Sequence, residues 1–269
     1  MNATASALSV LAALIFSSQA ALAADGVLLS ERTTTGTRTV TNEIKIEPTR
    51  IRAQVAPDAG EAQTIIFDGT RQVMWMISDQ RKGYSEMTKA DVDRMAGQMN
   101  EAMSRMREQM ANLPPAQRAQ LEAMMRGRGM PGAGAQAAAQ TEYRKAGTAT
   151  VGSWTCTRYE GFVNGQKQSE VCTVDPATLG FRASDFEVSK QLAEFFRQML
   201  PEGSDAMFRI GDGGGQGFEG LPVRRVYTRG NQQIVSEVTA ITRGTFPDSD
   251  FQVPAGYTKL PLPGTGRGR

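Results

Sequence analysis

The sequence predicts an α+β fold in which a meander of antiparallel strands is interrupted by a helical insertion. Three observations predict it. Apolar and polar residues alternate over short segments before residue 88, which is typical of half-buried strands. The apolar period then changes to three and four residues, as in an amphipathic helix. Strand-like segments return at Thr141 and continue toward the C-terminus, so strands flank the insertion on both sides.

The composition excludes several classes of active site. The 269 residues include no His and two Cys, and 30 basic side chains against 28 acidic ones give a net charge of +2. Without His the chain cannot form a Ser-His-Asp triad or use a His general base, and two Cys are too few for a four-cysteine zinc site. The small charge does not favour a nucleic-acid partner. No group of Asp, Glu and Ser has a recognisable catalytic pattern, so we expect no catalytic residue, resident metal or cofactor.

The first 23 residues have the pattern of a signal peptide. A short apolar run spans 7–16, and Ala21-Leu22-Ala23 has the small-x-small pattern of a cleavage site. The run is shorter than the ~20 apolar residues of a membrane-spanning helix, and no later segment approaches that length. We therefore expect residues 1–23 to be removed and the protein to be periplasmic, with full secretion as the alternative. A buried N-terminal helix is the competing interpretation.

The segment before residue 88 is predicted to form short antiparallel strands. Polar and apolar residues alternate from Asn42 to Glu47, and the pattern resumes after Pro48 and Thr49. Asp68-Gly69 is a hairpin signal between two apolar segments. The predicted strands are 42–47, 51–55, 64–67, 72–77 and 83–87.

The insertion, residues 88–127, is predicted to begin with a helix that carries a methionine-rich face. Thr88 and Asp91 have the spacing of an N-cap pair. Apolar residues then recur at steps of three and four, which places them on one side of the helix. These residues are Val92, Met95, Met99, Met103, Met106, Met110 and Leu113.

A second helix and a linker are predicted beyond this face. Pro114-Pro115 ends the first helix and starts another, which ends near Arg126. Residues 128–140 consist mainly of Gly, Ala and Gln without a usable period, so we expect a flexible linker there.

The two cysteines flank a predicted hairpin. Asn164-Gly165 is a hairpin signal. A three-residue loop from Val163 to Gly165 places Cys156 directly opposite Cys172, whereas a two-residue loop leaves them misaligned. Cα atoms of directly opposite residues are ~4.5–5.5 Å apart, which a disulfide can bridge. Because the C-x-x-C spacing of redox catalysts is absent, we expect a structural disulfide in an exported protein.

A third helix and a last hairpin are predicted to follow. Ser184 and Glu187 have the spacing of a capping box, and the apolar residues after them share one helical face. These residues are Val188, Leu192, Phe195, Phe196 and Met199. The glycine-rich segment 211–220 lacks the G-K-[ST] of a phosphate-binding loop and the carboxylates of a calcium loop. We interpret it as a connection to a hairpin of 222–227 with 233–242.

Several stretches together resemble an uncharacterised family of secreted bacterial proteins related to the LolA and LolB lipoprotein carriers. They are IIFDGTRQVMWMISDQRKGYSEMT (65–88), LPPAQRAQLEAMM (113–125), TATVGSWTCTRYEGF (148–162) and the C-terminal stretch 220–257. The C-terminal stretch is the most specific, and its end, Asp250 to Tyr257, is similar to the closing motif of that family. The resemblance covers most of residues 26–260, and the order of the motifs carries it.

The resemblance implies an incomplete antiparallel β-barrel. Its curved meander sheet would have a concave face covered by the Met-rich insertion and by a second helix, leaving an apolar cavity. In the lipoprotein carriers such a cavity holds acyl chains. We therefore expect a single half-barrel domain over residues 24–262, with a disordered tail at 263–269.

On this basis we expect a non-enzymatic periplasmic protein that binds a hydrophobic ligand, either a lipid or the acyl chain of a lipoprotein. Methionine is flexible and polarisable, so a methionine face suits a lid that accepts varied apolar partners. The expected lid and cavity residues are Met95, Met99, Met103, Met106, Met110, Trp75, Phe195 and Phe196.

Three alternatives remain open at this point. The methionine face could pack against the sheet as ordinary core. Thioethers bind Cu(I), so Met103, Met106 and Met110 could supply three soft ligands. A chaperone-like or structural interaction protein without a small ligand is the third alternative, and it rests on fold-level analogy. The sequence does not set the oligomeric state.

Overall fold

A single curved sheet of twelve strands forms the body of the protein. The computed structural model describes residues 25–55, 62–114, 117, 141–199 and 217–262. The first six strands are β1 (Asp25–Thr35), β2 (Arg38–Ile46), β3 (Arg50–Val55), β4 (Gln63–Asp68), β5 (Val73–Ser78) and β6 (Gly83–Thr88). The others are β7 (Glu142–Val151), β8 (Trp154–Val163), β9 (Gln166–Val174), β10 (Leu221–Arg229), β11 (Gln232–Thr245) and β12 (Thr258–Leu260).

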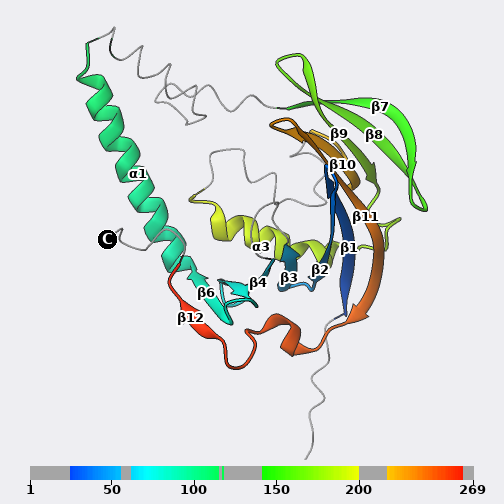
Figure 1. Ribbon diagram of the computed structural model, residues 1–269, viewed down its shortest axis with the longest axis horizontal. Coiled ribbons are helices and arrows are strands. Elements are labelled where there is room, and N and C mark those ends of the chain that lie inside the picture. Colours follow the sequence, from blue (N-terminus) through cyan, green and yellow to red (C-terminus); the bar gives the residue numbers. More distant parts are fainter. Residues whose placement is uncertain (1–24, 56–61, 115–116, 118–140, 200–216, 263–269) are drawn as a thin grey trace, which may run out of the picture.

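The sheet consists of two meanders that meet at one pair of strands. Its order is β12-β6-β5-β4-β3-β2-β1-β11-β10-β9-β8-β7, and it curves without closing (Figure 1). All neighbours are antiparallel except β12, which pairs with β6 in parallel. This architecture confirms the predicted α+β fold with an incomplete antiparallel barrel.

Strand β1 joins the two meanders, and it is absent from the predicted strands. It pairs with β2 on one side and with β11 on the other. Val27 and Leu29 pack into one apolar cluster, whereas Leu28 packs into another on the opposite face. A strand with apolar contacts on both faces does not alternate clearly in sequence. The β-branched run Thr33 to Thr35 is the signal that could have revealed it.

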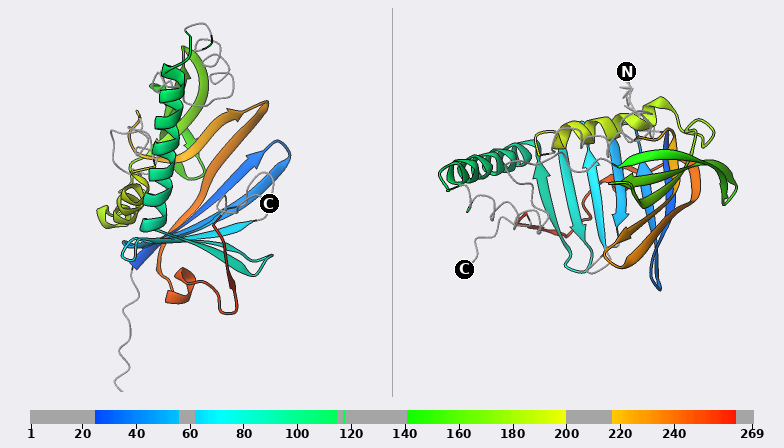
Figure 2. Two further views of the ribbon diagram at one scale, coloured as in Figure 1. Left: turned by 90° about the vertical axis from the view of Figure 1, so that its left-hand side faces the viewer. Right: turned by 90° about the horizontal axis from the view of Figure 1, so that it is seen from above.

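Helix α1 (Lys89–Ala111) continues directly from β6, and its predicted cap is confirmed. The Asp91 N–H donates to Thr88 Oγ1 at 3.3 Å, and the Thr88 N–H donates to Asp91 Oδ2 at 3.0 Å. These two bonds form a capping box, which satisfies two backbone donors at the start of the helix. The helix runs away from the edge of the sheet (Figure 2).

Helix α3 (Glu187–Phe196) lies across the concave side of the sheet (Figures 1 and 2). The capping box expected at Ser184 and Glu187 is wrong, because a 3₁₀ turn, η1 (Ala183–Phe186), precedes the helix. The carboxylate of Asp185 caps that turn by accepting the Arg182 N–H at 2.7 Å. Ser184 therefore lies inside the turn, and α3 begins without a side-chain cap.

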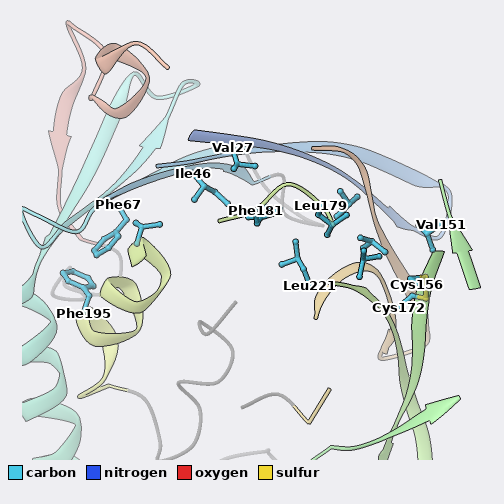
Figure 3. Close-up of a cluster of buried hydrophobic side chains, with 14 of the residues drawn as sticks. Val27, Ile46, Phe67, Val151, Cys156, Cys172, Leu179, Phe181, Phe195 and Leu221 are labelled. Atoms are coloured by element: carbon cyan, nitrogen blue, oxygen red, sulfur yellow. A yellow bond between two sulfur atoms is a disulfide. The ribbon is translucent and has the colours of Figure 1, made fainter. Parts of the chain in front are cut away.

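Apolar side chains form a cluster on each face of the sheet. The concave cluster contains Val27, Ile46, Phe67, Met74, Val188 and Phe195, and Figure 3 shows four of these six with labels. The convex cluster contains Ile66, Val73, Trp75, Ile77, Phe246 and Phe251. The second cluster lies between the sheet and the segment around η3 (Asp248–Phe251). Strands of the first meander are thus covered on both faces.

The predicted disulfide between Cys156 and Cys172 is confirmed, but the predicted hairpin loop is wrong. The loop has two residues, because Val163 pairs with Gln166. Asn164 and Gly165 both have positive φ, 52° and 76°, as a two-residue type I′ turn requires. A register shift after Gly161 then places Cys172 opposite Arg158. The cysteines are diagonal neighbours, with Cα atoms 5.5 Å apart, a distance that a disulfide bridges.

Several predictions concern segments outside the described residues. They are the signal peptide at 1–23, the second insertion helix, the linker at 128–140, most of the glycine-rich connection and the tail at 263–269. Within the described part of the chain, no helix combines the length and the apolar character needed to cross a membrane.

Candidate functional site

The concave face of the first meander is the candidate site, and α3 covers part of it. The Phe195 ring meets the Phe67 ring of β4 edge-on at 5.3 Å between centroids (Figure 3). Phe196 contacts Phe195 in a similar geometry at 4.9 Å. Phe195 is fully buried, whereas Phe196 is only half-buried. One aromatic residue thus anchors the helix, and its neighbour lies at the margin of the cluster.

An ion pair fixes the start of α3 to the sheet. Asp185 is almost fully buried and accepts two hydrogen bonds from Arg243 of β11, at 2.8 and 3.2 Å. Arg243 also donates to the carbonyl of Gly180 at 2.9 Å. The hydrogen bond to Asp185 is the main cause that raises the pKa of the Arg243 guanidinium. A buried carboxylate needs such a partner, so this pair specifies where the helix crosses the sheet.

The turn between β4 and β5 leaves room for α3 because it contains Gly69. A Cβ atom at this position would lie 1.7 Å from the Gln191 side chain of the helix. Real Cβ atoms do not approach another heavy atom so closely, so any larger residue would displace Gln191. The glycine predicted as a hairpin signal therefore has a second role in helix packing.

The methionine face of α1 is covered unevenly. Val92 and Ala96 begin this face and are buried, and Val92 belongs to the same core as the concave cluster. Further along, Met99 is 44% exposed, which makes it one of the most exposed large apolar side chains of the described chain. Met95, Met103 and Met106 are half-buried and Met110 is buried. The face that packs at the start of α1 thus continues as a partly exposed methionine stripe.

Trp75 does not lie with the other predicted cavity residues, and its assignment is corrected. Met74 belongs to the concave core, so its neighbour Trp75 points to the opposite face and joins the convex cluster. Its indole Nε1 donates to Glu86 Oε2 at 3.1 Å. Lys259 also donates to Glu86, and these two hydrogen bonds lower the pKa of the Glu86 carboxyl, the Lys259 bond contributing most.

Apolar side chains around the concave cluster remain partly accessible. These half-buried residues pack against the buried residues of the concave cluster and keep part of their own surface exposed. They are Leu29, Ile44, Ile51, Ile65, Met87, Leu192, Phe196 and Met199, among others. The site therefore combines a buried apolar floor with an accessible apolar margin. Such a surface can exclude water from an apolar ligand, and it offers few charged groups.

No group of three or more His, Cys, Asp or Glu residues that could hold a metal ion occurs within the described ranges. The soft-ligand set Met103, Met106 and Met110 lies on one face of α1, with two half-buried members and one buried member. Thioethers are soft ligands that select Cu(I), so the Cu(I) alternative rests on these three methionines.

Comparison with known families gives a clear assignment. The model of a domain of unknown function, DUF4412, matches residues 62–257. The chain belongs to the DUF4412 family. This membership confirms the resemblance to an uncharacterised family. No curated protein matches this DUF4412 chain.

The solved structures that resemble this DUF4412 protein share little of its sequence. An uncharacterized conserved protein from Thermus thermophilus is 8% identical, with a TM-score of 0.42 over 90% of this chain and 92% of that one. A chain of the MucA/MucB complex from Pseudomonas aeruginosa is 11% identical, with a TM-score of 0.36 over 88% of this chain and 59% of that one. A LolA superfamily protein from Nitrosomonas europaea is 8% identical, with a TM-score of 0.25 over 86% of this chain and 91% of that one.

Two polar features of this DUF4412 protein were missed in the sequence. Asp185 and Arg243 are far apart in the chain, and only the fold brings them together. Arg225 lies on β10 in the run Val223-Arg224-Arg225-Val226-Tyr227, which does not alternate between polar and apolar residues. No local pattern therefore distinguishes Arg225 from Arg224.

Proposed function

We propose that this protein is a non-enzymatic, exported binding protein for a hydrophobic, acyl-like ligand held on the concave face. One observation carries the proposal: accessible apolar residues surround the concave cluster, and the methionine stripe of α1 continues from the part of that helix that packs into the same core. Methionine side chains adapt to different apolar partners with little strain. The disulfide supports export, because such bonds persist in oxidising compartments.

The burial pattern of α1 favours the lid over simple core packing. A helix that only packs on the sheet would bury its methionines as it buries Val92 and Ala96. Instead, Met99 is exposed and Met95, Met103 and Met106 are half-buried, while Met110 is the one buried methionine of the stripe. An acyl chain lying between this stripe and the concave cluster would remove those side chains from water, at about 25 cal/mol per Å² of apolar area.

A triple substitution tests the lid. Met99, Met103 and Met106→Asp should leave the fold intact, because none of these side chains is fully buried. Binding of a dansyl-labelled fatty acid should weaken by at least tenfold, since three carboxylates on the lid disfavour an apolar ligand. The probe's fluorescence on titration gives the dissociation constant, and far-UV circular dichroism checks the fold.

The matched control places the same three charges elsewhere on the same helix. Gln98, Ser104 and Gln109 are exposed and lie off the methionine stripe, so their replacement by Asp should leave the affinity unchanged. Equal losses in both triple variants would contradict the lid, as would a wild-type protein that never binds the probe. A wild type that binds Cu(I) through Met103, Met106 and Met110 but no fatty acid would favour the metal alternative instead.

A further inference from the structure

The strand register places Arg225 on the concave face. Arg225 of β10 lies opposite Ser236 of β11, which in turn lies opposite Thr33 of β1. Directly opposite residues in antiparallel strands point to the same face. Along β1, Thr33 shares its face with Leu29, which belongs to the concave core. Arg225 therefore projects to the side that holds the candidate site.

One aromatic ring lies beside this guanidinium, and that ring packs against two tyrosines. The Phe218 ring lies 5.9 Å from the central carbon of the Arg225 guanidinium. Phe218 is buried and contacts Tyr143 edge-on at 4.9 Å, with Tyr159 at 6.1 Å. A planar guanidinium beside aromatic rings is held in place without losing its capacity to donate hydrogen bonds.

Among the described residues, Arg225 lacks the carboxylate partners that its neighbour Arg224 has. The next residue toward the N-terminus, Arg224, points to the other face and pairs with Glu170 at 3.2 Å and Glu237 at 3.1 Å. In the described part of the chain, Arg225 makes no hydrogen bond or ion pair with an acidic side chain. Glu31, whose charge acts on Arg225, instead accepts a hydrogen bond from Ser236.

A guanidinium without an acidic partner among the described residues favours an anionic ligand. Arg225 is exposed to solvent, and its neighbours remove part of the hydration of the guanidinium, which lowers the pKa of the group. The side chain remains a cation at neutral pH. An anion that binds it would restore the lost interactions, and the five N–H donors of Arg fit carboxylate or phosphate oxygens in pairs.

We propose that Arg225 binds the anionic head group of an amphiphilic ligand whose acyl chain lies on the apolar part of the same face. This inference rests on the proposed function and names the ligand class. Thr33 lies four residues along β1 from Leu29, about 13 Å at ~3.3 Å per residue. An extended acyl chain spans that distance between the concave cluster and the region of Arg225.

The experiment compares a charged and a neutral probe of the same chain. Dansyl-labelled undecanoic acid and its methyl ester are titrated into the wild type, Arg225→Gln, Arg225→Lys and Arg224→Gln. The wild type should bind the acid about tenfold more tightly than the ester, as expected for a charge-assisted hydrogen-bonded pair. Arg225→Gln should remove this preference by weakening only the acid, and Arg225→Lys should keep part of it. Arg224→Gln should bind both probes like the wild type.

Each result has one meaning. A wild type that binds acid and ester equally, or an Arg225→Gln variant that keeps the preference, overturns the role of Arg225 and leaves the proposed function standing. A wild type that binds neither probe overturns the proposed function as well. Competition with oleic acid and with oleoyl lysophosphatidic acid then separates the head groups. The better competitor identifies carboxylate or phosphate, provided that its advantage is lost in Arg225→Gln.

Discussion

At the scale of single residues, one step along the chain decides which part of the molecule a side chain serves. Met74 lies on the concave face and Trp75 on the convex face, because successive strand side chains alternate. Phe195 is fully buried against Phe67, whereas Phe196 lies at the margin of the concave cluster. The two phenylalanines of α3 therefore have different expected roles, in stability and in ligand contact.

We expect Phe195→Ala to lower the free energy of unfolding by about 3–5 kcal/mol, because it removes a large buried ring and leaves a cavity. Phe196→Ala should cost clearly less, since that ring is already half-exposed, but it should weaken binding of a dansyl-labelled fatty acid. Urea unfolding followed by tryptophan fluorescence measures the first effect. Equal losses of stability in the two variants would contradict this division.

At the scale of elements, the C-terminal segment holds the edge of the first meander. Strand β12 pairs with β6, and the Tyr257 hydroxyl donates to Asp79 at 2.8 Å. Lys259 donates to Glu86 at 2.7 Å, and Ser85 donates to the carbonyl of Pro261 at 3.0 Å. Such a cover protects an edge that would otherwise present unpaired backbone groups.

The pairing of β12 with β6 should depend on pH through Glu86. Its pKa is lowered from 4.5 in the folded state, mainly by Lys259 and then by Trp75. A lowered folded pKa means that the stabilisation is present above about pH 4.5 and is lost as the pH falls through the folded value. Glu86→Gln should therefore destabilise the protein at pH 7 and progressively less toward pH 3. In a Lys259→Met background the effect of Glu86→Gln on the free energy of unfolding should be smaller. A difference in urea stability between the wild type and Glu86→Gln that does not change with pH would contradict this mechanism.

At the scale of the whole molecule, β1 and β11 join two meanders into one sheet. Helix α3, reached from β9 of the second meander, packs on β4 of the first through Phe195 and Phe67. Arg243 of β11 binds Asp185 at the start of that helix. The strand pairing and the helix therefore connect the same two halves in two independent ways.

We propose that residues 24–262 unfold as one cooperative domain. The only two tryptophans report on different meanders, Trp75 on β5 and Trp154 on β8. The variants Trp154→Phe and Trp75→Phe each keep one tryptophan. In each variant, urea unfolding followed by the fluorescence of that tryptophan should have the same midpoint as unfolding followed by circular dichroism, as two-state unfolding requires. Fluorescence and circular dichroism midpoints that separate in either variant would indicate that the meanders unfold independently.

The sequence by itself determined the local structure of this protein. Alternation, turn residues and the change of period located most strands and the helices α1 and α3, because these signals depend on near neighbours in the chain. Thr88 and Asp91 formed the predicted cap for the same reason. The cysteine pair was also predicted, although the diagonal geometry was not, since a one-residue difference in loop length changes the register.

Only the tertiary structure decided which residues share a surface. Trp75 and Phe195 are both apolar and aromatic, yet the sheet separates them onto opposite faces. Arg225 and Arg224 are adjacent in sequence, but the partners of Arg224 come from β9 and β11, so only the register shows that Arg224 is the paired arginine. Strand β1 needed both of its neighbours to be recognised, because its apolar residues pack on two faces. Long-range pairing, which no local pattern encodes, set the concave face and with it the candidate site.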